Sequence, residues 1–439
     1  MRLRILALVP LLLLTAQLVP QAEAASVISG VDVSKYQHST GHLINWSQVR
    51  RSGQTFAFIK ATGGSDRTDP WFEREWAAAG SAGMIRGAYH YADPRHSADA
   101  QAAHVVGVVG STREANNLGI VLDLESSGGL GPAALARWAH TFLNGVERRT
   151  GRVPIIYTYP NFWHDKMRDN QGFGAYPLWL ARYSDQRPGP LPGWDRWTFW
   201  QHTSAYRVPG IPGGVDHDIM CCSLSTLRAL ADGRSTLITH VWKGLGGASG
   251  QLGLPLGPES AVPGGWAQTF ERGYVVATRG GTFAVTGETW KRYAASGAAT
   301  GPLGVPVAQG QQIAPGVTAQ RFARGLIVGS QATGWHALMG EFKARWLADG
   351  GVNAPEGLPT AESTTVSQQF VGGGLYPTPD GVRLVPGAIR DKYEELGGPG
   401  GPLGLPVAEA RSALGGRAVD FSTGSSLYEY VIAGQSIVL

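Results

Sequence analysis

One stretch of the chain is decisive for its fold, and it spans Gly119–Glu125 (GIVLDLE). It is short, apolar and ends in two acids, which is typical of a buried strand that reaches the rim of a barrel. Residues i and i+2 of a strand point to the same face, so Asp123 and Glu125 are expected to project together. Leu122 and Leu124 are then expected to face the other way, against helices.

Seven further apolar, β-branched stretches occur between residues 27 and 222. With the first they make eight candidate strands: Val27–Val33, Thr55–Lys60, Met84–Tyr91, Leu118–Glu125, Val153–Tyr159, Pro177–Arg182, Trp197–His202 and Val215–Cys221. The early intervals hold helical patterns at Phe72–Ala82, Ala98–Val109 and Pro132–Arg149, with another around Asn161–Asp169, whereas the later intervals are short and rich in Pro and Gly. This spacing predicts an α/β fold, an irregular (β/α)-barrel whose last quarter has lost its helices. A doubly wound sheet is the alternative, but no glycine-rich dinucleotide fingerprint follows a strand.

The acids of two other strands extend the candidate site. Asp32 ends the first strand, and Asp216 lies within the last one. First and last strands are neighbours in a closed barrel, so both acids are expected to face one cleft with Asp123 and Glu125. Two carboxylates in a partly desolvated cleft repel, which raises the pKa of one and keeps the other ionised. That pairing supplies a proton donor beside a stabilising charge, as glycoside hydrolysis requires.

After a short terminal helix and junction in residues 223–241, the chain repeats. Four aromatic residues, 47–53 residues apart, each precede a Leu-Gly-x-Pro-like motif by ten residues: Trp242, Tyr293, Trp346 and Tyr393. The four motifs are Leu252–Pro255, Leu303–Pro306, the degenerate Glu356–Pro359 and Leu403–Pro406, and each is followed by a Phe and, three residues later, a Gly. The pattern predicts a Gly-rich, mainly β array that is stacked or propeller-like, with the Phe, Leu and Pro positions in its core.

Composition limits the class of protein. The chain has 439 residues, of which 16% are charged and 43% hydrophobic, which excludes disorder as the main state and suits two or three domains. Gly occurs 62 times without a three-residue period, which excludes collagen. The net charge of +4 comes without a basic block, so no nucleic-acid partner is expected.

The N-terminus has the pattern of a signal peptide. Arg2 and Arg4 precede an apolar run, Ile5–Leu18, and a small-x-small cleavage site at Ala22–Ala24. The run is too short to span a bilayer, and no later stretch approaches the length required, so no membrane span is expected after the signal is removed. An uncleaved anchor is the alternative. The expected division is residues 1–24 as signal peptide, 25–235 as barrel domain and 236–439 as repeat domain.

The two cysteines, Cys221 and Cys222, are adjacent. Either they form a strained vicinal disulfide or both stay free and buried, and we favour a role in packing. No cofactor or metal is expected. A zinc amidase would require convergent His ligands, but neither H-E-x-x-H nor H-x-x-E-H spacing occurs and the histidines fall on unrelated segments.

The first half of the chain resembles glycoside hydrolase family 25, the lysozymes that cut peptidoglycan as N-acetylmuramidases. The matching stretches follow the family's order over about residues 28–223: Gly30–Gln37, Phe56–Thr62, Gly87–His90, Asp123-x-Glu125, Pro154–Thr158, Leu178–Ala181, Trp200–His202 and Val215–Asp216. The resemblance implies a barrel with five helices and three bare strands, and peptidoglycan glycan strands as substrate.

The resemblance also implies roles for single residues. Glu125 would be the general acid, and Asp123 would stabilise positive charge or orient the substrate's 2-acetamido group. Asp32 and Asp216 would hold the hydrogen-bond network and the sugar. Residues expected to bind substrate in the groove are Tyr89, Tyr157, Trp179, Trp200 and Lys60. The family commonly has Glu after Lys-Ala-Thr, whereas this chain has Gly63 and Gly64.

The repeats resemble the LGFP repeat of actinobacterial cell-envelope proteins, over roughly residues 240–439. This resemblance implies attachment to an envelope polymer. The hypothesis is therefore an exported muramidase held at the cell wall, cleaving the β-1,4 bond between N-acetylmuramic acid and N-acetylglucosamine. The alternative of another class is a catalytically inactive protein that only binds wall glycan, and a third hypothesis is a glycosidase for another acetylated amino-sugar polymer such as chitin.

Overall fold

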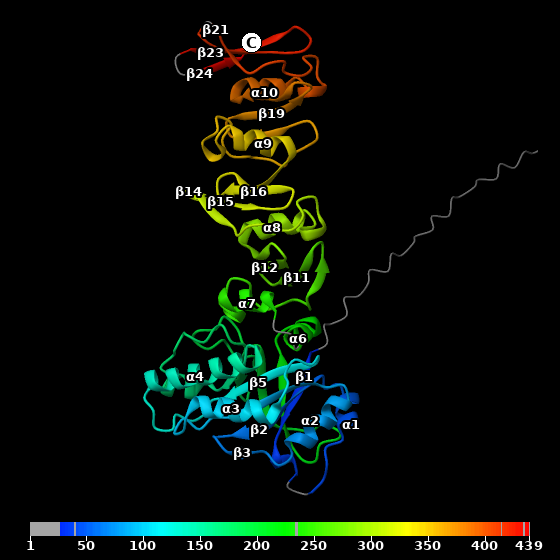
Figure 1. Ribbon diagram of the computed structural model, residues 1–439, viewed down its shortest axis with the longest axis vertical. Coiled ribbons are helices and arrows are strands. Elements are labelled where there is room, and N and C mark those ends of the chain that lie inside the picture. The colour runs from blue at the N-terminus through cyan, green and yellow to red at the C-terminus, as the bar shows by residue number, and fades with distance from the viewer. Residues whose placement is uncertain (1–26, 39–40, 233–235, 414, 433–434, 439) are drawn as a thin grey trace, which may run out of the picture.

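The computed structural model describes residues 27–38, 41–232, 236–413, 415–432 and 435–438. The expected signal peptide, residues 1–24, lies outside the described residues. Figure 1 shows a barrel at one end of the molecule and a stack of small sheets and helices that rises from it to the C-terminus. Within the described ranges, no helix combines the length and the apolar character needed to cross a membrane.

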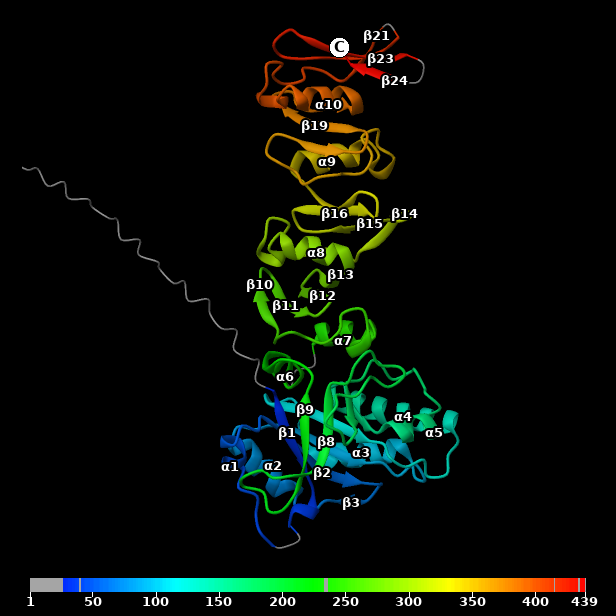
Figure 2. The same cartoon turned by 180° about the vertical axis from the view of Figure 1, so that it is seen from behind.

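The barrel has eight strands. They are β1 (Ser29–Val33), β2 (Phe56–Gly63), β4 (Ile85–Tyr91), β5 (Asn117–Asp123), β6 (Ile155–Thr158), β7 (Leu178–Ala181), β8 (Phe199–Tyr206) and β9 (Val215–Met220), and pairing of β1 with both β2 and β9 closes the barrel. The other seven barrel strands run parallel, whereas β9 is antiparallel to β8 and β1, and Figure 2 shows these three side by side. The two-residue strand β3 (Arg67–Thr68) flanks β2. The predicted barrel is confirmed, with one strand reversed.

Five helices connect the first six barrel strands, as the family resemblance implied. They are α1 (Trp46–Arg51), α2 (Phe72–Ser81), α3 (Ala98–Val109), α4 (Pro132–Thr150) and α5 (Pro160–Met167), and α6 (Leu224–Leu230) follows β9. Local sequence sets their ends: the Ser97 side chain caps α3 by accepting a hydrogen bond from the Ala100 amide, and α4 begins at Pro132 and ends at Gly151, whose φ is +72°.

Strand alternation divides the barrel core into two layers. The outward-facing residues Val31, Ile59 and Leu122 pack against helical residues such as Phe142. The inward-facing set fills the interior, with Phe58 stacked on Trp179 at a centroid distance of 4.2 Å. Leu122 and Leu124 belong to the outer layer, as predicted. The filled interior leaves space for a cleft only at the rim.

The repeats form four antiparallel sheets, which alternate with helices. The sheets are β10–β13 (Ser260–Val262, Gly265–Phe270, Gly273–Thr278, Gly281–Thr286), β14–β17 (Gln311–Ala314, Val317–Arg321, Gly325–Ser330, Gly334–Met339), β18–β20 (Gln368–Phe370, Gly373–Thr378, Gly381–Pro386) and β21–β24 (Arg411–Ala413, Gly416–Asp420, Ser426–Ile432, Gln435–Val438). Helices α7 (Leu237–Gly244), α8 (Gly287–Ala295), α9 (Gly340–Ala348) and α10 (Gly387–Glu395) lie between successive layers. Of the two arrangements that the sequence allowed, the structure has the stack, not the propeller.

The spacing of the repeat motif has a physical cause. In each copy the helical aromatic donates a hydrogen bond to the carbonyl oxygen of the motif glycine, as Trp242 Nε1 does to Gly253 at 2.7 Å and Tyr293 Oη does to Gly304 at 2.7 Å. Only Trp and Tyr combine a large apolar body with such a donor. The motif glycines have φ near +70°, the left-handed region that favours glycine. The motif proline bridges to the downstream Phe in all four copies.

The third copy differs at Glu356, where the other copies have Leu. Its side chain is 0% exposed, and neither carboxylate oxygen has a hydrogen-bond partner among the described residues. Burial raises its pKa to about 7. A carboxyl group is therefore buried at a position where the other three repeats have an apolar leucine.

The first repeat contacts the barrel directly. Lys243 of α7 pairs with Glu147 of α4, and Arg196 pairs with Glu271 at 2.7 Å. Cys221 and Cys222 are joined in a vicinal disulfide and pack against the apolar cluster around Trp242, so the structure has the disulfide and not two free thiols.

Candidate active site

A cleft of about 930 Å³ opens at one rim of the barrel. The rim is formed by the carboxyl ends of the parallel strands and by the amino end of β9, because β9 runs the opposite way. Asp32, Asp123, Glu125 and Asp216 all line this cleft, as predicted from the sequence. Asp32 and Asp216 lie directly opposite each other in the β1–β9 register. The reversal of β9 explains why Asp216, near the start of its strand, meets acids at the ends of theirs.

Asp32 is held by an amide at the base of the cleft. Gln201 Nε2 of β8 donates to Asp32 Oδ2 at 2.7 Å, and Tyr157 Oη donates to Gln201 Oε1 at 3.0 Å. Burial, reinforced by the charge of Asp216, raises the pKa of Asp32 well above its ordinary value. Asp32 is therefore a buried, hydrogen-bonded carboxyl group that gains a proton readily.

Asp123 and Glu125 form a coupled pair. Asp123 ends β5 and is buried, whereas Glu125 lies two residues beyond and is only half-buried in the cleft. Burial raises the pKa of Asp123 well above its ordinary value, and the charge of Glu125 and a hydrogen bond between the two raise it further. The carboxyl group of Asp123 thus favours its protonated form beside Glu125.

Asp216 faces the same space in a more open position. Burial raises its pKa to about 6, and a hydrogen bond with Tyr183 acts in the opposite direction. Two residues on, Asp218 points to the same side of β9 but is 0% exposed. Its Oδ1 accepts a hydrogen bond from Trp179 Nε1 at 2.7 Å, and its Oδ2 has no partner among the described residues. Asp218 thus supports Trp179 from below the cleft.

Four of the five residues expected to bind substrate line the cleft: Tyr89, Tyr157, Trp179 and Lys60. The Lys60 ammonium lies 5.0 Å from the ring centroid of Tyr91 and 5.7 Å from that of Tyr89. The prediction for Trp200 is wrong. Trp200 belongs to the outer core layer, is 3% exposed and donates to the Arg182 carbonyl, because Phe199 and Gln201, its neighbours on β8, take the inward positions.

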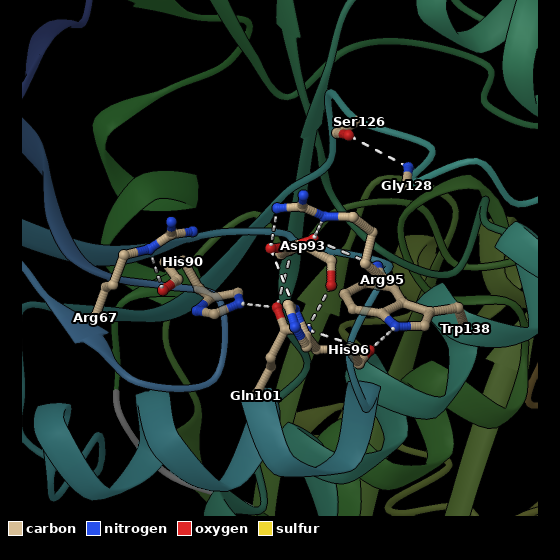
Figure 3. Close-up of polar contacts among 10 residues, drawn as sticks. Arg67, His90, Asp93, Arg95, His96, Gln101, Ser126, Gly128 and Trp138 are labelled. Carbon is tan, nitrogen blue, oxygen red and sulfur yellow. Dashed lines mark hydrogen bonds and ion pairs between the residues drawn. The ribbon is translucent and has the colours of Figure 1, made fainter.

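A second network fixes the loops beside the acids, as Figure 3 shows. Arg95 makes two hydrogen bonds of 2.8 Å to the Asp93 carboxylate, and Gln101 of α3 bonds to both the backbone of Asp93 and the ring of His90. The loop that carries Glu125 packs against this one at Gly128, where a Cβ would lie 2.7 Å from the Arg95 amide nitrogen. A glycine is therefore required there, and the contact limits the positions that Glu125 adopts.

The structure adds residues that the sequence did not single out for the site. Asp218 could have been found by the alternation rule, since it lies two residues after Asp216. Gln201 could not, because its neighbour Trp200 was predicted to face inward. Tyr91 also lines the cleft, and the same rule could have found it, since it lies two residues after Tyr89. Tyr183 and Arg67 line the cleft from positions that carry no such signal. Among the residues that the structure covers, no group of three or more His, Cys, Asp or Glu is arranged to hold a metal ion.

Comparison with known proteins agrees with this geometry. Residues 31–211 match the family described as "Glycosyl hydrolases family 25". The chain is 37% identical to lysozyme M1 of Streptomyces globisporus over 216 residues, which cover 47% of this chain and 72% of that protein. It is 32% identical to the N,O-diacetylmuramidase of a Chalaropsis species over 219 residues, which cover 47% of this chain and 100% of that one. The chain belongs to glycosyl hydrolases family 25.

Two further similarities are to a repeat family and to a solved structure. Residues 252–301, 303–353 and 356–401 match the LGFP repeat. A solved bacterial lysozyme from Streptomyces coelicolor aligns with 48% of this chain and 99% of its own, at 35% identity and a TM-score of 0.46. The family 25 chain is thus a lysozyme-type glycoside hydrolase with LGFP repeats in its C-terminal region.

Proposed function

We propose that this protein is an exported N-acetylmuramidase that cleaves the β-1,4 bond between N-acetylmuramic acid and N-acetylglucosamine in peptidoglycan. Residues 25–235 form the hydrolase domain in this proposal, residues 236–439 the envelope-binding domain, and residues 1–24 the signal peptide. The observation that carries the proposal is that Asp123 and Glu125 line one cleft of about 930 Å³ together with Asp32 and Asp216.

The chemistry follows from the positions of the two carboxyl groups. Glu125, half-buried and facing the cleft, donates a proton to the glycosidic oxygen while the bond from that oxygen to the sugar C1 breaks. Positive charge develops at C1 and the ring oxygen, and Asp123 stabilises it as a carboxylate or through the substrate's acetamido group. Water then supplies hydroxide to C1 and returns a proton to Glu125.

In this proposal the pair exchanges a proton when substrate binds. In the free cleft, burial and the neighbouring charge favour the protonated form of Asp123. A bound sugar displaces water from around Glu125, which disfavours its charged form as well. The proton can then move along the hydrogen bond to Glu125, and Asp123 is left as the charge that faces the developing cation.

Other cleft residues bind and orient the sugar. Asp32, fixed by Gln201, and Asp216 present carboxyl oxygens to sugar hydroxyls and amides. Tyr89, Tyr157 and Trp179 offer aromatic faces and edges for the apolar faces of sugar rings. Burial raises the pKa of both tyrosines, so their hydroxyls stay protonated and act as donors.

Analysis of the new chain ends tests the proposed bond specificity. The full-length protein is incubated with purified peptidoglycan, and the soluble products are reduced with borohydride and analysed by mass spectrometry. We expect reduced muramic acid at the new ends. Reduced glucosamine ends would refute the assignment of the bond, and the absence of new ends despite sedimentation with the wall would favour the inactive glycan-binding alternative.

A second experiment tests the envelope attachment. Full-length Glu125→Gln protein, which cannot consume its target, is sedimented with intact envelope and with peptidoglycan freed of its outer polymers. Retention that is markedly stronger on the intact envelope is expected if the repeats bind an outer polymer. Equal retention on both would contradict binding of an outer polymer by the repeats.

A further inference from the structure

The lip of the cleft carries a short hairpin whose role the catalytic chemistry does not explain. Strand β3 (Arg67–Thr68) pairs antiparallel with the end of β2, with Gly63 opposite Arg67 and Thr62 opposite Thr68. The side chains of this hairpin line the cleft together with Lys60 and the acids of the base. An exposed arginine thus lies at the entrance to a cleft whose base is acidic.

The hairpin backbone holds the Arg67 guanidinium in place. Nε donates to the Gly63 carbonyl at 3.2 Å. Gly64 has φ of +63°, and a Cβ there would lie 3.1 Å from Nη2. The two glycines therefore allow the guanidinium to lie against the turn. Gly63 stands where the family pattern has Glu, so this lip lacks that carboxylate.

Within the part of the chain that the structure describes, the Arg67 guanidinium has no carboxylate partner. Arg95, the neighbouring arginine in Figure 3, is bonded twice to Asp93, whereas no acid among the described residues pairs with Arg67. Asp69, on the same hairpin, is already occupied, because it accepts from the Lys35 and Trp71 amides. Arg67 is thus a fixed cation with free donors that face the cleft.

The register gives the distance of Arg67 from the reacting bond. Gly63 is level with Tyr91 on β4, and Tyr91 is level with Asp123 on β5. Three steps of about 4.8 Å separate the Arg67 backbone from that of Asp123, roughly 14 Å along the rim. The backbone of Arg67 therefore lies well away from Asp123 along the rim, and its side chain reaches into the part of the cleft that would hold a neighbouring sugar.

The geometry points to Arg67 as a specificity-determining residue that binds a carboxylate carried by the glycan. The inference rests on the proposed function, since muramic acid is the sugar of peptidoglycan that bears acidic substituents. The carboxylate is either the lactyl group itself or a carboxyl group of the attached peptide. A planar guanidinium donates two parallel hydrogen bonds to a carboxylate. A neutral glycan such as chitin has no carboxylate to accept them.

Kinetics on one glycan preparation in three forms tests the inference. The forms are glycan strands with intact peptides, strands from which an amidase has removed the peptides to leave free lactyl carboxylates, and peptide-bearing strands whose carboxylates have been converted to methylamides. Full-length wild type is compared with Arg67→Gln, Arg67→Lys and Arg51→Gln. Arg51 is an exposed arginine outside the cleft, so Arg51→Gln controls for the loss of one positive charge.

We expect Arg67→Gln to lower kcat/KM about tenfold on carboxylate-bearing strands, through KM, and to change it less than twofold on the methylamide form. Arg67→Lys should recover part of the loss, and Arg51→Gln should match wild type. The peptide is amide-linked to the lactyl group, so a loss confined to peptide-free strands identifies the free lactyl carboxylate as the ligand. A loss confined to peptide-bearing strands identifies a peptide carboxylate, and a loss on both shows that Arg67 binds either one.

Two results would overturn the inference. A loss of the same size on the methylamide form would show that Arg67 acts without a carboxylate, and Arg67→Gln kinetics equal to those of Arg51→Gln on every form would show that it binds nothing. Both require an active wild type and leave the proposed function intact. A wild type that cuts none of the three forms would instead refute the proposed function, and this inference with it.

Discussion

Replacing Glu356 by leucine is expected to stabilise the third repeat, and the gain is expected to grow with pH. The carboxyl group is fully buried, without a hydrogen-bond partner, and burial raises its pKa from an ordinary 4.5 to about 7. The folded state therefore prefers the protonated form. Its stability is highest below about pH 4.5, falls as the pH rises from there, and levels off above about pH 7.

The size of the effect follows from the pKa difference. One pH unit corresponds to about 1.4 kcal/mol, so the rise to about 7 costs about 3 kcal/mol at high pH. The charges of Asp349 and Arg345 act on this pKa in opposite directions, so burial of the carboxyl group is the main source of the cost. Leucine removes that cost and adds about 1–2 kcal/mol from apolar burial, as Leu252 and Leu303 show that the site accepts it.

Hydrogen exchange followed by mass spectrometry measures the gain locally. The amides of α9 and of residues 351–359 report the opening free energy of this repeat at about pH 5 and about pH 8, after correction for intrinsic rates. Glu356→Gln is the matched control, because it removes the charge and keeps the shape. It should abolish the pH dependence without the apolar gain.

Two outcomes would refute this reasoning. A wild-type repeat that is more stable at about pH 8 than at about pH 5 would mean that the carboxylate is charged and paired. Equal protection in wild type and Glu356→Leu at about pH 8 would mean that the group carries no burial cost.

The remaining predictions concern the cleft. Burial raises the pKa of Asp216 to about 6, so the wild type loses stability as the pH rises from about 4 to about 7.5. Asp216→Asn should make that loss smaller by about 1–2 kcal/mol, as measured by urea unfolding at the two pH values. An unchanged loss would contradict this. Gln201→Leu should lower kcat at least tenfold, because the Asp32 carboxyl group loses the amide that orients it, and unchanged steady-state kinetics would contradict that role. Trp179→Leu should raise KM severalfold and Trp200→Leu should leave KM unchanged where the protein stays folded by circular dichroism; the reverse order would contradict the assignment of only Trp179 to the cleft.

The barrel could be predicted because the patterns of its strands and of its helices are both strong in this sequence. Strands with apolar runs and helices with patterned faces alternate, and the acids at strand ends then fall on one rim. Asp123 and Glu125 could be paired from their i, i+2 spacing alone. The reversed direction of β9 could not be predicted, because a short connection allows either direction and only the closed sheet shows which one forms.

The errors at the site come from features that a strand pattern does not encode. Trp200 was chosen as an aromatic in a family motif, but its neighbours Phe199 and Gln201 take the inward positions, and parity then places Trp200 outside the barrel. Arg67 lies on a hairpin that contains Gly63 and Gly64. The place of its side chain depends on how the backbone turns there, which the periodicity of the sequence does not show.

In the repeats, the sequence predicted the core but not its arrangement. Fixed distances between aromatic, motif and Phe positions indicated units that share a core. Whether such units close into a ring or continue as a line depends on the rotation between neighbours, which the sequence does not specify. The hydrogen bond from Trp or Tyr to the motif glycine explains afterwards why those two residue types alternate at one position.

The most direct test of the account compares Glu125→Gln with Glu73→Gln in the full-length protein. Glu73 is an exposed glutamate on α2, outside the cleft, so its variant controls for the same chemical change. The rate of release of new reducing ends from peptidoglycan is measured at saturating substrate. The account predicts a fall of about 10³-fold for Glu125→Gln and no change for Glu73→Gln. A Glu125→Gln rate within a fewfold of wild type would contradict the assignment of Glu125 as the acid.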